Sequence, residues 1–176
     1  MSRADAALAL IIFAFMAVEA QRAARNERAQ RARGGIEPSA DVYTWMSFAY
    51  PASFLAMLIE GAVRGAPPPA IVVAGAVVFA AAKTLKWWAI FTLGRFWTFR
   101  VIVVPGATLV TTGPYRFLRH PNYVGVVGEL VGAALMTGAL IAGPIATIGF
   151  AVLILRRIAV EERTLGVAAE RRPTDV

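Results

Sequence analysis

The chain has 176 residues, of which 58% are hydrophobic and 16% are charged, and it carries a net charge of +7 at neutral pH. Together with a mean hydropathy of +0.62, this composition excludes an ordinary soluble domain and predicts a multispanning membrane protein. The sequence has no cysteine and one histidine, which excludes disulfides, thiolate nucleophiles and metal sites built from several such side chains, so we expect no bound metal.

The first apolar run extends from Ala4 to Ala20 and is interrupted only by Asp5 and Glu19. As a helix it is just long enough to cross a hydrocarbon core of about 30 Å, so it predicts a first span. Residues 18–20 also resemble a small-residue cleavage site, so a cleaved signal peptide is the alternative.

Residues 21–41 form a polar segment that is rich in arginine. The spacing of Arg22, Arg25 and Glu27 would let the first helix extend into water until a glycine pair ends it. The simpler interpretation, which we favour at this point, is a solvated basic loop held by anionic lipid headgroups.

A second span is predicted over residues 42–63, with a kink at Pro51, and a third over residues 70–91. Lys83 and Lys86 lie in the last third of the third span. Lysines at that depth normally extend to the membrane interface, so we expect this of both, and contact with a phosphate or carboxylate is the alternative.

The longest polar connection follows, over residues 92–121. Its pieces 101–104 and 108–110 are separated by Pro105-Gly106, which predicts two short extended segments with a turn between them. A connection of this length that has hydrophobic content of its own is usually functional.

Pro121 suits the first turn of a fourth span that ends near residue 138, and residues 144–159 return as a fifth. We expect these two helices to be each other's main partners, with glycines on one face of the fourth allowing close approach. Glu129 lies in the fourth span, where an ionisable group is costly. It therefore either lines the route of an acceptor from the bilayer or pairs with a basic residue of another helix.

The whole chain, residues 1–176, is predicted to be a single membrane domain of the all-α class with about five transmembrane helices. Residues 1–91 contain three of them, 92–121 form a cytosolic loop, 122–160 form a helical hairpin and 161–176 form a cytosolic tail.

Basic residues gather at the ends of the apolar runs. If residues 21–41 are cytosolic, all 18 basic residues except Arg3 and Arg64 fall on the cytosolic side. No basic stripe with interleaved aromatic residues is present, so we expect membrane lipids and no nucleic acid as partners. The protein is therefore predicted to lie in the inner or cytoplasmic membrane with its N-terminus outside.

The stretch Gly-Pro-Tyr-Arg-Phe-Leu-Arg-His-Pro-Asn-Tyr, residues 113–123, contains the only histidine. Taken separately, His120 could cap the helix that follows, and Arg157 with Glu161 could be a plain ion pair one turn apart. An antiparallel hairpin, however, brings His120 and Tyr123 to the same depth as Arg157 and Glu161. The sequence therefore predicts a shared site at the cytosolic edge.

Residues 113–123, the hairpin and Arg157-x-x-x-Glu161-Glu162 together resemble the isoprenylcysteine carboxyl methyltransferase family of integral membrane enzymes, over about residues 90–165. The resemblance implies S-adenosyl-L-methionine as methyl donor, in a cytosolic pocket formed by the loop and the C-terminal helix. It implies cofactor contacts at the following residues: Thr108, Leu109, Val110, Tyr115, His120, Pro121, Asn122, Tyr123 and Glu161.

Two positions depart from the family pattern. Ala107 stands where relatives can carry a polar side chain, and Arg100 stands where an amide side chain can contact the cofactor. Arg100 is kept among the candidate cofactor contacts.

The resemblance also implies that Arg157 faces a lipophilic small-molecule or lipid substrate that enters from the bilayer, with Glu129 a candidate lining of its route. A carboxylate acceptor is ionised at neutral pH and needs only a cation such as Arg157 to position it. A phenol or enol acceptor needs a weak base, for which His120 is the candidate. Arg157 and His120 are thus the predicted catalytic residues of an O-methyltransferase acting on an isoprenylcysteine-like or long-chain polyketide or lipid acceptor.

Three other functions stay open from the sequence. Sterol reductases resemble the C-terminal hairpin, so a membrane reductase that uses NADPH is one. A phospholipid N-methyltransferase is the second, and a non-catalytic membrane module whose arginines bind anionic lipid is the third.

Overall fold

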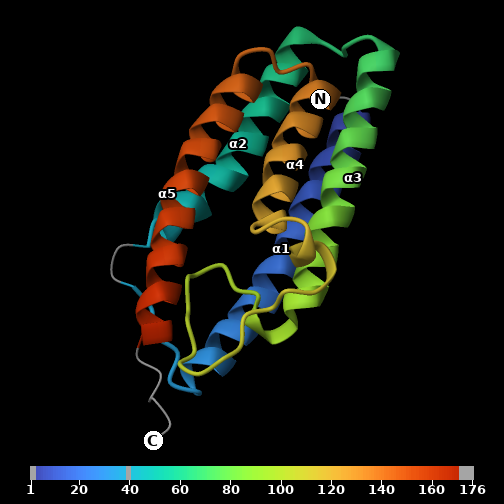
Figure 1. The fold of residues 1–176 in the computed structure, drawn as a ribbon. Helices are drawn as coiled ribbons and strands as arrows, with labels where there is room; N and C mark the ends of the chain where they lie inside the picture. The colour runs from blue at the N-terminus through green and yellow to red at the C-terminus, as the bar shows by residue number, and fades with distance from the viewer. Residues whose placement is uncertain (1–2, 39–40, 171–176) are drawn as a thin grey trace, which may run out of the picture.

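The computed structural model of the protein describes residues 3–38 and 41–170. Within these residues five α-helices follow one another (Figure 1): α1 Arg3–Arg31, α2 Tyr43–Arg64, α3 Pro69–Leu93, α4 Pro121–Thr137 and α5 Ala142–Glu170. The predicted all-α fold of a polytopic membrane protein is confirmed.

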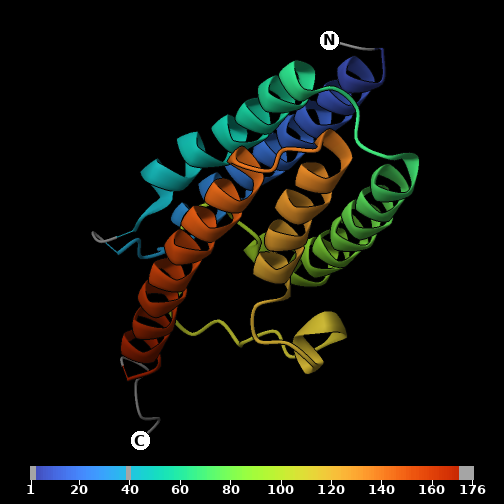
Figure 2. The same ribbon diagram turned by 90° about the horizontal axis from the view of Figure 1, so that it is seen from above.

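Four of the helices, α1, α2, α3 and α5, are long and apolar enough to cross a membrane. The fourth in chain order, α4, has 17 residues and is shorter than the others. Where the sequence predicts about five spans, the described residues therefore contain four long ones and one short helix packed among them. Figure 2 shows α4 between α3 and α5.

The connection between α3 and α4 contains two short 3-10 helices, η1 (Gly94–Phe96) and η2 (Gly113–Arg116). The two extended segments predicted in this connection do not form a sheet. Among the described residues, the β pairing is limited to one antiparallel bridge between Ile36 and Val103. This bridge ties the α3–α4 connection to the connection between α1 and α2.

The interpretation of residues 21–31 as a solvated loop is wrong, because α1 continues to Arg31. The polar side chains of this extension have partners on the α3–α4 connection. Asn26 donates hydrogen bonds to the carbonyl oxygens of Gly94 (3.0 Å) and Trp97 (2.7 Å). Glu27 accepts from two backbone N–H groups further along the same connection. The extension of α1 therefore supports this connection.

Glycines let α4 lie directly against α3. A Cβ atom added at Gly125 would stand 2.8 Å from the Cβ of Lys86, and one added at Gly132 would stand 2.7 Å from the backbone nitrogen of Phe79. The expectation that α4 and α5 are each other's main partners is wrong, because the glycine face of α4 packs on α3. The other faces of α4 contact α2 and α5.

The centre of the bundle is apolar and tightly packed. Phe54 and Met57 of α2 meet Leu130 of α4 and Phe150 of α5 in one cluster of buried side chains. Large apolar side chains such as Trp45 are instead exposed on the outward faces of the helices. Such an exposed apolar surface fits contact with lipid.

Candidate functional site

The fold brings the two sequence motifs together at one end of the bundle. His120 lies just before α4 and Tyr123 in its first turn, whereas Arg157 and Glu161 lie one turn apart on α5. The hydroxyl of Tyr123 donates to the Glu161 carboxylate (2.8 Å) and accepts from Nε of Arg157 (2.9 Å). The prediction that the hairpin brings these groups together is confirmed. We call these four residues the motif cluster.

The imidazole of His120 stacks on the ring of Tyr123, with centroids 5.5 Å apart and an angle of 24° between the planes. Its Nε2 lies 3.4 Å from the carboxylate of Glu162. His120 occupies the N-cap position of α4, but its side chain makes no hydrogen bond to the start of that helix and instead contacts Tyr123 and Glu162.

Arg157 is buried, with 5% of its surface exposed. Besides the bond to Tyr123, Nη1 donates to the carboxylate of Asp41 (2.8 Å) and Nη2 donates to the carbonyl oxygen of Phe99. A guanidinium has five N–H donors, so two of them have no acceptor among the residues that the structure describes. Arg157 and Glu161 do not form the plain ion pair considered from the sequence, because the hydroxyl of Tyr123 bridges them.

Asp41 is a member of this site that the sequence reasoning missed. It accepts hydrogen bonds from Arg157, from the N–H of Tyr43 (3.1 Å) and from the N–H of Val101 (2.9 Å). The only local signal for it is an acidic residue placed just before a predicted span, a position where a carboxylate often satisfies free N–H groups.

The α3–α4 connection supplies the other predicted cofactor contacts. The side chains of Thr108 and Leu109 are exposed, and no backbone N–H or C=O group of residues 108–110 has a partner within the described part of the chain. Burial raises the pKa of Tyr115, and the charge of the Glu161 carboxylate raises it further. Tyr115 thus lies within electrostatic reach of the motif cluster and keeps its hydroxyl proton.

Two further predicted contacts lie at the start of α4. Pro121 is buried in the first turn of that helix. The side-chain oxygen of Asn122 accepts a hydrogen bond from the indole N–H of Trp97 (3.2 Å), which holds it beside the α3–α4 connection. Their roles stay predictions.

Arg100 contacts a different part of the chain. Its Nη1 lies 2.5 Å from Glu37, and its guanidinium stands 4.6 Å from the ring centre of Tyr43. The hydrogen bond with Glu37 raises the pKa of Arg100. Partial burial raises the pKa of Glu37, but the hydrogen bonds and charges of Arg100 and Arg31 outweigh it and hold that pKa below its ordinary value. Within the described residues the Arg100 guanidinium contacts none of the four motif residues.

A second group of ionisable side chains lies inside the bundle. We call it the interior cluster; its members are Glu19, Tyr50, Lys83, Lys86 and Glu129. Lys86 is 2.6 Å from Glu19 and 3.4 Å from Glu129, and Lys83 is 3.2 Å and 2.9 Å from the same two carboxylates. Tyr50 also donates a hydrogen bond to Glu129.

The structure contradicts the expectation that the side chains of both lysines extend to the membrane interface. Lys83 and Lys86 do not reach the interface, because two carboxylates on neighbouring helices neutralise them inside the bundle. For Glu129 the sequence left open a place on the acceptor's route or an ion pair with a basic residue of another helix. The structure shows ion pairs with Lys83 and Lys86. A part in the acceptor's route stays a prediction.

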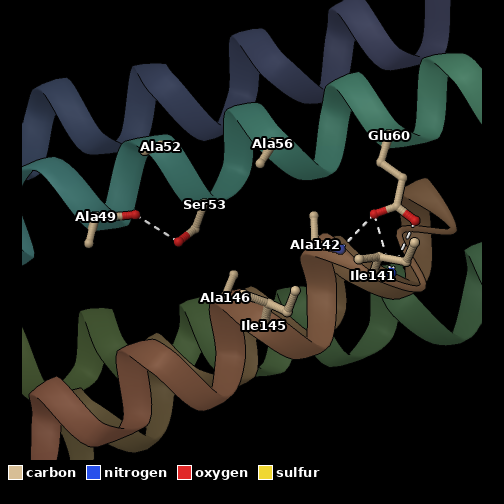
Figure 3. A pocket seen from close by; sticks show the side chains of 9 residues that line it. All are labelled: Ala49, Ala52, Ser53, Ala56, Glu60, Ile141, Ala142, Ile145 and Ala146. Carbon is tan, nitrogen blue, oxygen red and sulfur yellow. Dashed lines mark hydrogen bonds between the residues drawn. The ribbon is translucent and has the colours of Figure 1, made fainter.

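A hollow of about 550 Å³ opens between α2 and α5 (Figure 3). It is lined by small or apolar side chains and by Glu60: Ala49, Ala52, Ser53, Ala56, Glu60, Ile141, Ala142, Ile145 and Ala146. Glu60 caps α5, because its carboxylate accepts from the N–H groups of Ile141 (3.0 Å) and Ala142 (2.6 Å). The hollow adjoins the first turns of α5, whereas Arg157 lies in the second half of that helix.

Comparison with known proteins gives one family. The model of the isoprenylcysteine carboxyl methyltransferase (ICMT) family matches residues 73–167, which run from α3 through the motif cluster on α5. The uncharacterized protein YpbQ of Bacillus subtilis is 30% identical over 158 residues, which cover 90% of this chain and 94% of that protein.

Two other relatives share shorter stretches. An uncharacterized protein of Haemophilus influenzae is 26% identical over 116 residues, 65% of this chain and 67% of its own length. The cobalt-zinc-cadmium resistance protein CzcN of Cupriavidus metallidurans is 35% identical over 80 residues, 44% of this chain and 36% of its own length. No solved structure matches.

Proposed function

The chain belongs to the isoprenylcysteine carboxyl methyltransferase family of membrane methyltransferases, and on that premise we propose that it transfers a methyl group from S-adenosyl-L-methionine to a carboxylate or hydroxyl of a lipophilic acceptor. The observation that carries the proposal is the motif cluster. Two motifs that lie far apart in the sequence supply an aromatic pair, a buried arginine and a carboxylate to one place.

The residues around the motif cluster fit the chemistry of S-adenosyl-L-methionine. The donor carries a sulfonium cation, an amino acid end, ribose hydroxyls and an adenine edge. Glu161 offers a carboxylate for a cationic or hydroxyl group, and the ring faces of Tyr115 and Tyr123 suit a cation. The backbone groups of residues 108–110, which have no partner in the described part of the chain, suit a planar edge with its own donors and acceptors. When bound, the donor supplies an electrophilic methyl group whose sulfonium charge is lost on transfer.

Arg157 is proposed to hold the acceptor. Two of its N–H donors have no acceptor among the described residues, and they lie on a buried guanidinium whose other donors are fixed by Asp41, Tyr123 and Phe99. A carboxylate or an oxyanion is the group that such a pair of donors recognises best. The main contribution of the protein is then to align two reactants and to exclude water.

His120 is proposed as the base when the acceptor is a phenol or an enol. The nearby carboxylate of Glu162 and the ring of Tyr123 fix the plane of the imidazole. These contacts restrict the directions in which the imidazole can take a proton, which favours some acceptor geometries over others. A carboxylate acceptor would not need this step.

The orientation in the membrane is part of the proposal. The charge distribution supports an N-terminus outside and a motif cluster that faces the cytosol of a bacterial-type inner membrane. The acceptor would enter from the bilayer, because the outward faces of the helices are apolar and exposed. Arg100, Pro121 and Asn122 stay candidate cofactor contacts, and Glu129 stays a candidate for the acceptor's route.

The proposal is tested on the purified full-length chain in lipid nanodiscs. Calorimetry measures the binding of S-adenosyl-L-methionine, and labelled methyl transfer is followed into total membrane lipids, into a farnesylated cysteine and into a long-chain alkylphenol. The stability of the product to mild base separates an ester from an ether or an amine. We expect binding and transfer by the wild type, weaker binding and slower transfer in Glu161→Gln, and wild-type behaviour in Glu60→Gln, the same chemical change near the opposite end of α5.

Binding of NADPH without binding of the sulfonium donor would instead identify a reductase. Binding of neither, with lipid association unaffected by Glu161→Gln, would leave a non-catalytic membrane module.

A further inference from the structure

Asp41 lies where three separate parts of the chain meet. It belongs to the connection between α1 and α2, and one of its oxygens accepts from both Arg157 on α5 (2.8 Å) and the N–H of Tyr43 at the start of α2 (3.1 Å). The other oxygen accepts from the N–H of Val101 in the α3–α4 connection (2.9 Å). The side chains of Asp41 and Arg157 are each 6% exposed.

Arg157 depends on this carboxylate for its charge balance. Among the described residues, Asp41 is the one ionised group in direct contact with the guanidinium, since the other two partners are a hydroxyl and a carbonyl. A buried arginine without an ionised partner is strongly disfavoured and turns toward water when it can. Without the charge of Asp41, the long side chain of Arg157 would therefore lose its single buried position.

Asp41 also fixes the direction in which Arg157 points. The guanidinium is planar and is held through Nε, Nη1 and Nη2 by three different elements, so its two remaining N–H donors have set directions. The same carboxylate anchors Val101, which belongs to the connection that carries the proposed donor contacts. The position of the acceptor-binding group is thereby tied to the part of the chain that would hold the methyl donor.

We propose that Asp41 is a positioning residue that aims Arg157 at the acceptor. This inference rests on the proposed function, in which Arg157 contacts the acceptor. Asp41 lies outside residues 73–167, the stretch that the family match covers. The α1–α2 connection therefore contributes to the specificity of the site through a single carboxylate.

The first test separates positioning from a general structural role. The variants are Asp41→Asn, which keeps the shape and removes the charge, Asp41→Glu, which restores the charge, and the control Glu60→Gln. Glu60, on α2, also accepts from backbone N–H groups, here at the start of α5, but it does not touch Arg157. For each variant, calorimetry measures the affinity for S-adenosyl-L-methionine, and initial rates give kcat and KM for farnesylated cysteine or alkylphenol, whichever the wild type methylates.

We expect Asp41→Asn to lower kcat/KM for the acceptor about 100-fold while the affinity for the donor changes less than about 3-fold. Asp41→Glu should recover part of the loss, and Glu60→Gln should behave as the wild type. A normal kcat/KM in Asp41→Asn would overturn the proposal. An equal loss of donor affinity and acceptor turnover would also overturn it, because that pattern indicates a structural role.

A second measurement does not depend on activity. In protein that contains isotope-labelled arginine, the Nε–H resonance of Arg157 is assigned by its absence in Arg157→Lys. Asp41→Asn should shift or broaden this resonance, and Glu60→Gln should leave it in place. If the wild type binds no donor and methylates nothing, the proposed function fails, and the resonance alone then decides whether Asp41 holds Arg157. An unchanged resonance in Asp41→Asn would overturn the inference.

Discussion

The interior cluster and the motif cluster both contain charged side chains, but they differ in how those charges are balanced. In the interior cluster two lysines and two glutamates neutralise one another, with each lysine within 3.4 Å of both carboxylates. In the motif cluster Arg157 keeps two N–H donors without an acceptor in the described part of the chain.

This difference separates holding the fold from binding a ligand. A network of balanced charges inside a bundle can fix the register of helices, but it offers a ligand no net charge. A cluster at the end of the helices that has unused donors can bind one. We therefore expect damage to the interior cluster to appear mainly in stability and damage to the motif cluster mainly in binding and turnover.

The largest effect on stability is expected from Lys86→Met. This change leaves Glu19 and Glu129 facing each other with one lysine between them, and breaking a buried pair from one side costs about 3–5 kcal/mol. Unfolding in nanodiscs measures the loss. The double variant Glu19→Gln with Lys86→Gln removes one charge of each sign and should recover much of it. If Lys86→Met is as stable as the wild type, the claim that the interior cluster stabilises the fold is wrong.

The next largest effect should be seen in turnover, in Arg157→Lys. Lysine keeps the charge but lacks the planar fork, so the acceptor loses its alignment and labelled methyl transfer should fall about 100-fold. Stability should fall less than in Lys86→Met, because an ammonium group can still pair with Asp41. Arg163→Lys, at an exposed arginine of the same helix, is the matched control. If both variants are equally active, the assignment of Arg157 to the acceptor is wrong.

A smaller effect is expected for Glu161→Gln. The loss of one charged hydrogen-bond acceptor should raise the dissociation constant for S-adenosyl-L-methionine about 10-fold, or about 1.4 kcal/mol. Calorimetry measures this dissociation constant, with Glu60→Gln as the control variant. An unchanged affinity would remove Glu161 from the donor site and would leave the motif cluster with an acceptor role only.

The smallest effect concerns the pH dependence of stability that Glu37 contributes through its contacts with Arg31 and Arg100. The pKa of Glu37 in the folded protein lies below its ordinary value of 4.5, so the carboxylate binds fewer protons in the folded than in the unfolded protein. Its contribution to stability is therefore present above pH 4.5 and is lost as the pH falls through the lowered pKa. The difference in stability between the wild type and Glu37→Gln should be small at neutral pH and should vanish in acid. A difference that grows in acid would contradict this.

The fold and the meeting of the two motifs could be predicted because both depend on local patterns. Apolar runs predict the helices, and one tight turn between α4 and α5 requires that His120 and Arg157 lie at the same end. The C-terminal end of α1 was harder to predict. Residues 21–31 are polar, and the sequence alone does not reveal that their side chains bind the α3–α4 connection.

The interior cluster could not be predicted because its partners are distant in sequence. Lys83 and Lys86 lie 64 and 67 residues from Glu19, and nothing in one span reveals which neighbour it will have. Taken alone, a lysine near the end of a span is expected to reach water. Asp41 was missed for the same reason, since it lies 116 residues from Arg157.

The most direct test of the central claim is the titration of S-adenosyl-L-methionine into the wild-type protein and Lys86→Met in nanodiscs. The account predicts that the wild type binds the donor, that S-adenosylhomocysteine competes for the same site, and that the folded fraction of Lys86→Met binds with an affinity within about 2-fold of the wild type. The account is contradicted if the wild type does not bind the donor, or if the folded fraction of Lys86→Met loses donor binding.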